Sequence, residues 1–191
     1  MDLNSRLNKI LEIIQSPGFL ERKGLGNEIA YFIFDYPPHN ELAVRQHIKY
    51  LLRKLSYDGS PFRAVELNLY DVVIDVLRSQ NLFDKSIDME TKKGRSFLFT
   101  ALKPVLKPEK IVNIIGEKAK GNNLLFLTGI GCVWPLLRSH NVLNNLHSVL
   151  DNIPIIMFFP GEYDGAELML FGKFKDDNYY RAFRLVEEGN I

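Results

Sequence analysis

Cys132 and His140 are the residue pair whose types most directly suggest chemistry, because an imidazole can activate a nearby thiol as a nucleophile. One such pair cannot form a closed zinc site, since structural zinc usually takes four protein ligands. The nucleophile hypothesis rests only on proximity in the sequence, and a buried, unreactive Cys132 is the stronger expectation. We therefore expect no catalytic residue, no metal and no cofactor.

A nucleotide-hydrolysing site needs a glycine loop of backbone N–H donors, a lysine, a hydroxyl on Mg²⁺ and an acidic partner. Pro37 and Pro38 follow the first apolar run and lack the N–H donors of a phosphate cradle. Thr128 stands where an acidic metal partner would end a strand, and the segment 129–131 is too short for a dinucleotide fingerprint. ATP or GTP hydrolysis is not expected, and a degenerate nucleotide-binding protein stays open as the alternative.

Loops at the ends of the expected strands are the remaining places for a small ligand, because ligands bind beyond the carboxyl ends of strands in open parallel sheets. These loops are 35–39, 70–71, 128–131 and 160–165. The residues that would contribute to such a ligand site are Asp35, Tyr36, Thr128, Gly129, Gly131 and Gly161.

The stretch 138–145 is unusually polar for a packing helix and places Arg138, Asn141 and Asn145 near one face. A solvated face with i,i+4 hydrogen bonds is the stronger explanation, and a partner-binding face is the alternative. The segment 160–165 is first of all turn chemistry, although an exposed Tyr163 could anchor an interface. The candidate partner-binding residues are Arg138, His140, Asn141, Asn144, Asn145, Tyr163 and Asp164.

Charge gives little reason to expect nucleic acid or a membrane surface as a partner. Lys and Arg total 24 against 23 Asp and Glu, a net charge of +1, so no global field attracts a polyanion. Arg22 and Lys23 precede two glycines and could bind an anion, although loop geometry explains them better. The cluster at 92–95 is the other local argument for direct DNA contact, which we do not expect.

Strands and helices alternate along the chain, which is typical of crossover units in a parallel sheet. Apolar, β-forming runs without strict alternation predict strands covered on both faces. The segment 84–108 is the least legible and leaves room for one helix. The expected strands are 29–35, 63–69, 124–128, 153–159 and 168–174, and the expected helices are 3–14, 40–55 with Asn40 as cap, 72–77, 109–120, 136–150 and 179–186.

These elements predict a single α/β domain over residues 1–191. Its core would be a mostly parallel open sheet of about five strands with helices on both faces, similar to a degenerate P-loop topology. The strand order is left open. The apolar runs are shorter than the roughly 20 residues that span a bilayer, the first 17 residues are unlike a signal peptide, and one cysteine cannot form an internal disulfide. We expect a cytoplasmic protein without membrane contact.

Five segments together carry a resemblance that spans nearly the whole chain: RKGLGNEIAYFIFDYPP (22–38), ELNLYDVV (66–73), LTGIGCVWPLLRSHNVLNNL (127–146), IPIIMFFPGEYDG (153–165) and LFGKFKDDNYYRAF (170–183). In these segments the chain resembles the BrxB-type proteins of bacterial BREX (bacteriophage exclusion) systems. The resemblance implies antiviral defence beside a methyltransferase, a large ATPase, a Lon-like protease and the alkaline-phosphatase-superfamily protein PglZ. It implies no catalytic residues and a noncatalytic interaction subunit that contacts PglZ or another BREX protein.

Overall fold

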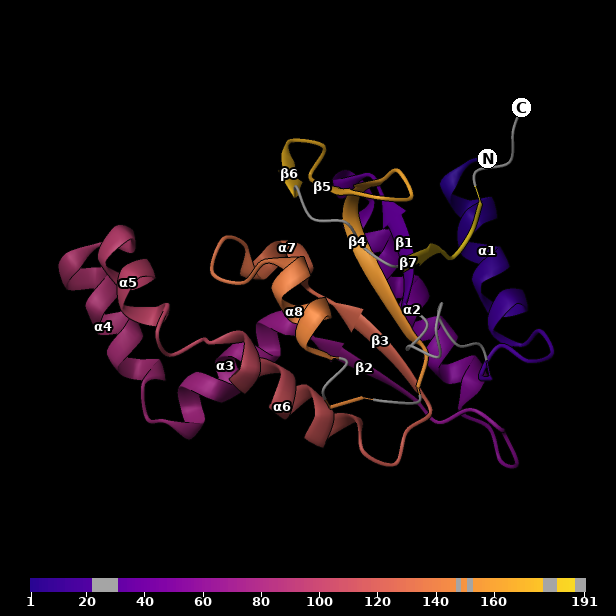
Figure 1. Cartoon of the computed structure of the whole chain (residues 1–191), viewed down its shortest axis with the longest axis horizontal. Coiled ribbons are helices and arrows are strands. Elements are labelled where there is room, and N and C mark those ends of the chain that lie inside the picture. Colours follow the sequence, from indigo (N-terminus) through magenta and orange to yellow (C-terminus); the bar gives the residue numbers. More distant parts are fainter. Residues whose placement is uncertain (22–30, 147–148, 151–152, 177–181, 188–191) are drawn as a thin grey trace.

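The apolar runs of the sequence form the strands of a central sheet flanked by helices (Figure 1). The structure is a computed structural model, and it describes residues 1–21, 31–146, 149–150, 153–176 and 182–187. The elements, in chain order, are α1 (Leu3–Ile14), β1 (Tyr31–Tyr36), the 3-10 helix η2 (Pro38–Asn40), α2 (Glu41–Leu55), β2 (Ala64–Asn68), α3 (Leu69–Ser79), α4 (Phe83–Lys93), α5 (Arg95–Leu102), α6 (Pro108–Ala119), β3 (Leu124–Thr128), α7 (Ile130–Val133), α8 (Ser139–Leu146), β4 (Ile155–Tyr163), β5 (Leu168–Leu170), β6 (Phe174–Asp176) and β7 (Ala182–Arg184).

Five strands pair in parallel in the order β2-β3-β4-β1-β7, which confirms the predicted fold class of a mostly parallel open sheet with helices. Tyr31 of β1 is in register with Ile155 of β4 on one side and with Ala182 of β7 on the other. The end of β4 continues into an antiparallel ribbon with β5 and β6. After β1 the chain forms β2 at one edge of the sheet and then adds β3 and β4, so that β4 lies beside β1. Strand β7 pairs with the other side of β1.

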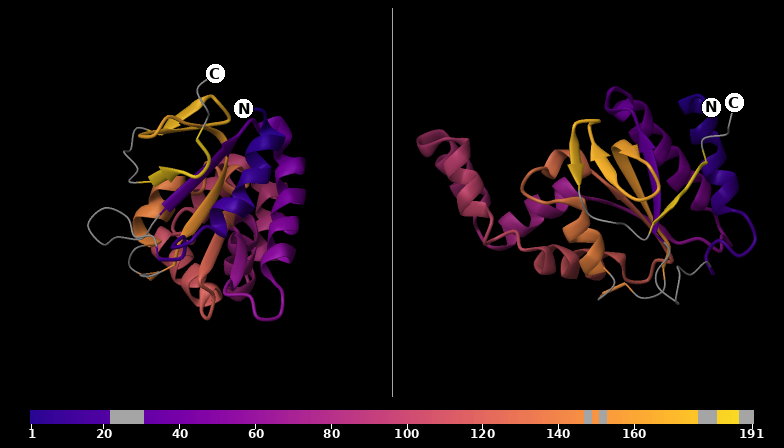
Figure 2. Two further views of the ribbon diagram at one scale, coloured as in Figure 1. Left: turned by 90° about the vertical axis from the view of Figure 1, so that its right-hand side faces the viewer. Right: turned by 45° about the horizontal axis from the view of Figure 1, so that its top comes forward.

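Each face of the sheet is covered by helices because successive strand residues point to opposite faces (Figure 2). Phe32 and Phe34 of β1 pack with the buried residues of α1 and α2, whereas Ile33 packs with those of α3, α6 and α8. All six residues of β1 are buried. This double covering is why the strands read as continuous apolar runs in the sequence.

Helix α1 is held against the sheet by one apolar stripe and begins at a side-chain cap. Leu7, Ile10 and Ile14 are buried, and the Asp2 carboxylate accepts a hydrogen bond from the backbone N–H of Ser5 at 2.9 Å. The same stripe carries a charged residue, Arg6, which is only 5% exposed. A buried arginine needs a partner, and α1 thereby delivers a cation to the sheet.

The prediction of one helix in residues 84–108 was wrong, because this region contains all but the first residue of α4, the whole of α5 and the first residue of α6. Gly94 joins α4 and α5 with φ +79°, a conformation that favours glycine. The two helices form a hairpin that projects from the body of the molecule (Figures 1 and 2). We call residues 83–102 the arm.

Several predicted boundaries near the C-terminus were also wrong. Residues 182–184 form β7 instead of part of a helix over 179–186, because they pair with β1. The strand expected over 168–174 is split into β5 and β6, and β4 runs on to Tyr163 instead of ending before Pro160.

Two helix starts also differ from the sequence expectation. Helix α8 covers only Ser139–Leu146 of the predicted 136–150, and a short helix, α7, begins at Ile130 where a turn was expected. The Asn40 side chain makes no capping hydrogen bond to α2. None of the helices that the structure describes is long and apolar enough to cross a membrane.

Candidate functional site

The carboxyl end of β1 is the natural place to look for a ligand, because open parallel sheets bind ligands where the connections of neighbouring strands diverge. Helix α2 leaves β1 on one face, while α3, α6 and α8 cover the other. A cavity of about 320 Å³ opens at this edge. Its lining includes Arg6, Asp35, Tyr36, Gly161 and Phe171, so three of the six predicted ligand-loop residues meet there.

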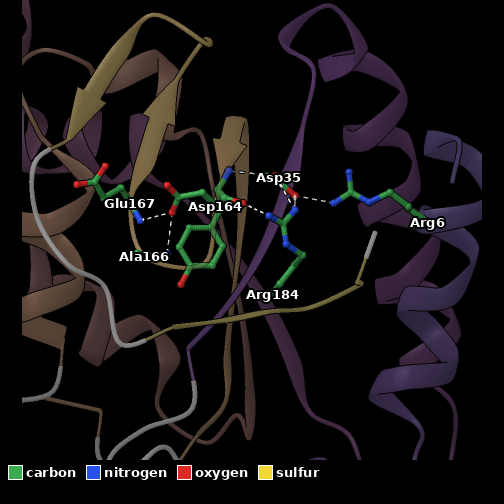
Figure 3. A network of polar contacts seen from close by, with 7 residues as sticks. Arg6, Asp35, Asp164, Ala166, Glu167 and Arg184 are labelled. Atoms are coloured by element: carbon green, nitrogen blue, oxygen red, sulfur yellow. Dashed lines mark hydrogen bonds and ion pairs between the residues drawn. The ribbon is translucent and has the colours of Figure 1, made fainter. Parts of the chain in front are cut away.

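Asp35 is the centre of a buried polar network at this edge (Figure 3). Arg6 Nη2 donates to Asp35 Oδ1 at 2.5 Å, and the backbone N–H of Tyr163 donates to Oδ2 at 3.0 Å. Arg184 Nη1 lies 3.4 Å from Oδ1 and 3.2 Å from Oδ2. Both carboxylate oxygens thus accept bonds from the protein itself, and Asp35 joins α1, β4 and β7 to β1.

Arg184 also donates through Nη2 to the backbone carbonyl of Tyr163, so the guanidinium bridges β7 and β4. The aromatic faces beside the network are occupied as well. The Arg6 guanidinium lies 4.9 Å from the centre of the Phe34 ring and that of Arg184 lies 5.9 Å from the Tyr163 ring. The arrangement is that of a structural clamp around one carboxylate.

The expectation that Tyr163 is exposed was wrong. Its side chain is only 1% exposed, and its hydroxyl lies 2.8 Å from the carbonyl oxygen of Ala182 and 3.0 Å from that of Gly165. The reason is the extension of β4, whose pleat turns Glu162 outward and Tyr163 inward. Tyr163 therefore fixes β7 to β4 and cannot anchor an interface.

Asp164 follows Tyr163 and is exposed, but its carboxylate is engaged in the turn. Its Oδ1 accepts hydrogen bonds from the backbone N–H groups of Ala166 at 2.8 Å and Glu167 at 2.7 Å. The bond from Glu167, followed by that from Ala166, holds the pKa of Asp164 below its ordinary value. This confirms the turn chemistry expected of the segment, and a role for Asp164 in partner binding stays a prediction.

A second polar chain runs from Tyr36 to Cys132. The Tyr36 hydroxyl donates to Glu41 Oε2 at 2.5 Å, Arg45 Nε donates to Glu41 Oε1 at 2.7 Å, and Arg45 Nη2 lies 3.6 Å from Cys132 Sγ. Burial, and secondarily the bond to Glu41, raises the pKa of the Tyr36 hydroxyl, so the tyrosine is a proton donor and not a base.

The expectation that Cys132 is buried was wrong, because it is exposed at the start of the connection after β3. The sequence resembled a nucleophile pattern only through His140, whose side chain lies outside the described residues. Among the described residues, the structure places Arg45 beside the Cys132 thiol.

Thr128 and the glycines that follow it accommodate parts of the protein. The Thr128 hydroxyl donates to Glu66 Oε1 at 2.8 Å. Gly129 has φ +74°, and a Cβ there would lie 2.0 Å from the side-chain oxygen of Asn68. A Cβ on Gly131 would lie 2.7 Å from the Phe171 ring. The two glycines allow side chains of the protein to lie close to the backbone. In a nucleotide site, glycines would instead leave room for phosphate groups.

Helix α8 presents the predicted polar face only in part. Arg138 and Asn144 are exposed, and Asn145 donates to the backbone carbonyl of Asn141 at 2.7 Å, which is an i,i+4 bond of the kind that a solvated helix face makes. Arg138 also lies at a cavity of about 250 Å³ beside Trp134 and Phe174, whose rings stack with centroids 4.1 Å apart. Arg22 and Lys23 lie outside the described residues.

Two of the residues that build the clamp, Arg6 and Arg184, were missed by the sequence reasoning. A signal was present for Arg6, because it occupies the i+3 position between Leu3 and Leu7 in the apolar stripe of α1. Asp35, a charge at the end of a buried strand, was the matching signal. Nothing comparable marked Arg184, because residues 179–186 were predicted as a helix.

Within the described part of the chain, no group of three or more His, Cys, Asp or Glu residues could hold a metal ion. Asp35 and Glu162 both line the cavity, and the carboxylate of Asp35 accepts bonds from two arginines and a backbone N–H. At this edge the network joins four elements, and the exposed residues of the cavity lining include Pro37, Pro38 and Glu162.

Comparison with known proteins gives a consistent result over nearly the full length. The sequence profile of a family described as "BREX protein BrxB" matches residues 65–185. A BREX protein BrxB of Bacillus cereus (strain H3081.97) is 47% identical over 190 residues, covering 97% of this chain and 98% of the relative. A BREX protein BrxB of Escherichia coli O9:H4 (strain HS) is 39% identical over 188 residues, covering 97% and 92%. No solved structure matches the chain.

Proposed function

Since this chain belongs to the BrxB family of BREX proteins, which implies a role in BREX phage defence, we propose that it is a noncatalytic interaction subunit that binds PglZ. Its work would take place in the cytoplasm. Binding of PglZ, or of another BREX protein in its place, is the specific part of the proposal.

The observation that carries the noncatalytic part is the saturation of Asp35. An α/β enzyme keeps reactive groups at the carboxyl ends of its strands, whereas here the acid at that position accepts bonds from Arg6, Arg184 and the Tyr163 backbone. Phe171 then packs over Gly131 from the β5–β6 ribbon. Such an edge supports a scaffold whose activity lies in contacts with other proteins.

Co-purification tests the proposal directly. The tagged chain is expressed with PglZ from the same operon, captured at moderate salt, and passed over a sizing column. We expect the two proteins to elute together at micromolar concentration. Co-elution of another BREX protein without PglZ would replace the partner, and separate elution from every BREX protein would remove the proposal.

Degenerate nucleotide binding is the alternative function, and one observation favours it. The strand order places the carboxyl end of β1 at the point where connections diverge, which is where nucleotides bind in doubly wound sheets. Pro37 and Pro38 follow that strand and supply no N–H donors. The alternative is tested by the nucleotide titration described in the Discussion.

A further inference from the structure

The arm packs little against the rest of the described chain. Helix α4 has no buried residue, and α5 has one, Leu102. The base of the arm is anchored, because Leu102 and Leu106 are in the core and Leu98 packs against it. Beyond that base the two helices extend away from the sheet and its covering helices (Figure 1; Figure 2, right).

The outward surface of the arm carries large apolar side chains. Ile87 is 52% exposed and Phe97 is 45% exposed, and neither is in a core cluster. Isolated helices of 11 and 8 residues are marginal in water, so the fold gains little stability of its own from extending them. Exposed apolar side chains on an element that contacts the core only at its base are typical of an interaction surface.

The charges of the arm indicate which kind of partner would bind it. Residues 83–102 carry four cations and three acids, a net charge of 4 − 3 = +1. Lys92 pairs with Asp88 at 3.5 Å and Arg95 with Glu90 at 3.6 Å, while the Lys93 ammonium lies 4.3 Å from the centre of the Phe97 ring. Residues 92–97, which we call the tip of the arm, therefore combine positive charge with an aromatic ring.

We infer that the arm is the docking element of this protein, and that its partner is a protein surface with an apolar groove bordered by acidic residues. Such a groove would bury Ile87 and Phe97 and complement the cations at 92–95. A second copy is disfavoured because two arms of net positive charge repel each other. Nucleic acid is disfavoured because Asp88 and Glu90 lie among the cations and Ile87 offers nothing to a phosphate backbone.

This inference rests on the proposed function, because it assigns the surface through which the BREX partner is bound. The test measures the Kd of the wild-type chain and four variants for purified PglZ. The arm variant is Ile87→Ser with Phe97→Ser, and the tip variant is Lys92→Glu with Lys93→Glu. The α8 variant is Arg138→Ala with Asn144→Ala.

The matched control is Leu42→Ser, which removes an apolar side chain that is 73% exposed on α2, away from the arm. Circular dichroism and the melting temperature check that each variant folds, as expected for exposed positions. We expect the arm variant to raise Kd by at least about tenfold, because exposed aromatic and aliphatic anchors dominate binding. The tip variant should also raise Kd, and more strongly at low salt, while the control stays at the wild-type value.

The possible outcomes separate the two proposals. If the wild-type chain and the arm variant bind PglZ equally, the arm inference is overturned and the proposed function stands; loss of binding only in the α8 variant has the same meaning. If the wild-type chain binds neither PglZ nor any other BREX protein, the proposed function is overturned, and the arm inference with it. Salt-sensitive binding of duplex DNA that the tip variant abolishes, with PglZ binding unchanged, would show that the arm serves nucleic acid instead.

Discussion

Asp35 is a single buried acid on which α1, β4 and β7 converge. Bringing a carboxylate and two guanidinium groups out of water is costly, and the bonds between them offset that cost only while all are present. Removing the acid would leave the charges of Arg6 and Arg184 in a site where the side chains are 7% and 18% exposed. The clamp is thus more sensitive to loss of one member than an exposed ion pair would be.

Asp35→Asn is expected to lower the free energy of unfolding by about 3–5 kcal/mol, because it removes one partner of a buried ion pair. The matched control is Asp75→Asn, whose ion pair with Lys118 has both side chains 42% exposed and should contribute about 1 kcal/mol or less. Urea denaturation of both variants at neutral pH measures the difference. Equal losses in the two variants would contradict the role of Asp35 as a buried clamp.

His47 on α2 gives the stability of the protein a dependence on pH. Its Nε2 is buried without a hydrogen-bond partner in the described structure, and burial lowers its pKa, which a hydrogen bond with the backbone of Leu7 only partly opposes. The unfolded chain, whose histidine keeps the ordinary value of about 6.5, therefore binds a proton more readily than the folded chain.

We expect the free energy of unfolding to fall as the pH is lowered through about 6.5, and to recover as the pH rises above it. His47→Gln should remove much of this dependence, whereas His39→Gln on the 3-10 helix η2 serves as the control. Denaturation series between about pH 5 and 8 give the slope for each protein. A slope that His47→Gln leaves unchanged would assign the dependence to other groups.

At the scale of elements, the β5–β6 ribbon closes the carboxyl edge of the sheet through one side chain. Phe171 lies against Gly131 of α7, and the ring also contributes to the cavity beside Asp35. Because the ribbon is tied to β4 by short antiparallel pairing, it can shift only by disturbing that pairing. The ribbon can therefore lie against α7 only because Gly131 has no Cβ.

Gly131→Ala should destabilise the protein by about 1–3 kcal/mol through overpacking against Phe171, despite the better helix propensity of alanine. In a Phe171→Ala background the same substitution should cost less, because the ring atoms 2.7 Å from the new Cβ are gone and Pro160 Cγ, at 3.2 Å, is the close contact that remains. A double-mutant cycle by thermal or urea denaturation measures this coupling. Additive effects would show that the two positions do not interact.

The elements that the sequence predicted well are those whose pattern is local. The runs that form β1, β3 and the first part of β4 are mostly apolar, so their type and burial followed from composition. Strand β7 could not be predicted, because it depends on pairing with β1 and on bonds from Arg184 and Tyr163 to distant residues. The arm was illegible because helices that bury almost nothing have no apolar stripe to mark them.

The whole molecule combines a sheet topology that suits ligand binding with an edge that its own residues fill. The predicted site residues Asp35, Tyr36 and Gly161 do meet at one cavity, because parallel strands end at the same edge. Their roles could not be read from the sequence, since whether Asp35 is free or clamped depends on α1 and β7. The sheet topology therefore predicts where a ligand site could lie, but not whether Asp35 is available to bind a ligand.

Titration with ATP and Mg²⁺ is expected to leave the melting temperature unchanged and to give no turnover. A ligand that binds the native state would stabilise it by about 2.7 kcal/mol at a concentration of 100 times its Kd. Differential scanning fluorimetry with Mg²⁺ alone as control measures the shift. A melting temperature that rises with nucleotide concentration would favour the degenerate nucleotide-binding alternative.

The position of β1 in the sheet has a consequence for synthesis on the ribosome. Tyr31 pairs with Ile155 and with Ala182, so both neighbours of this strand are translated long after it emerges. Until then an aromatic-rich strand has two unsatisfied edges and is vulnerable to association with other nascent chains. Folding of the sheet is therefore completed only after β7 has been translated, and products terminated before β4 should be recovered as aggregates or bound to chaperones.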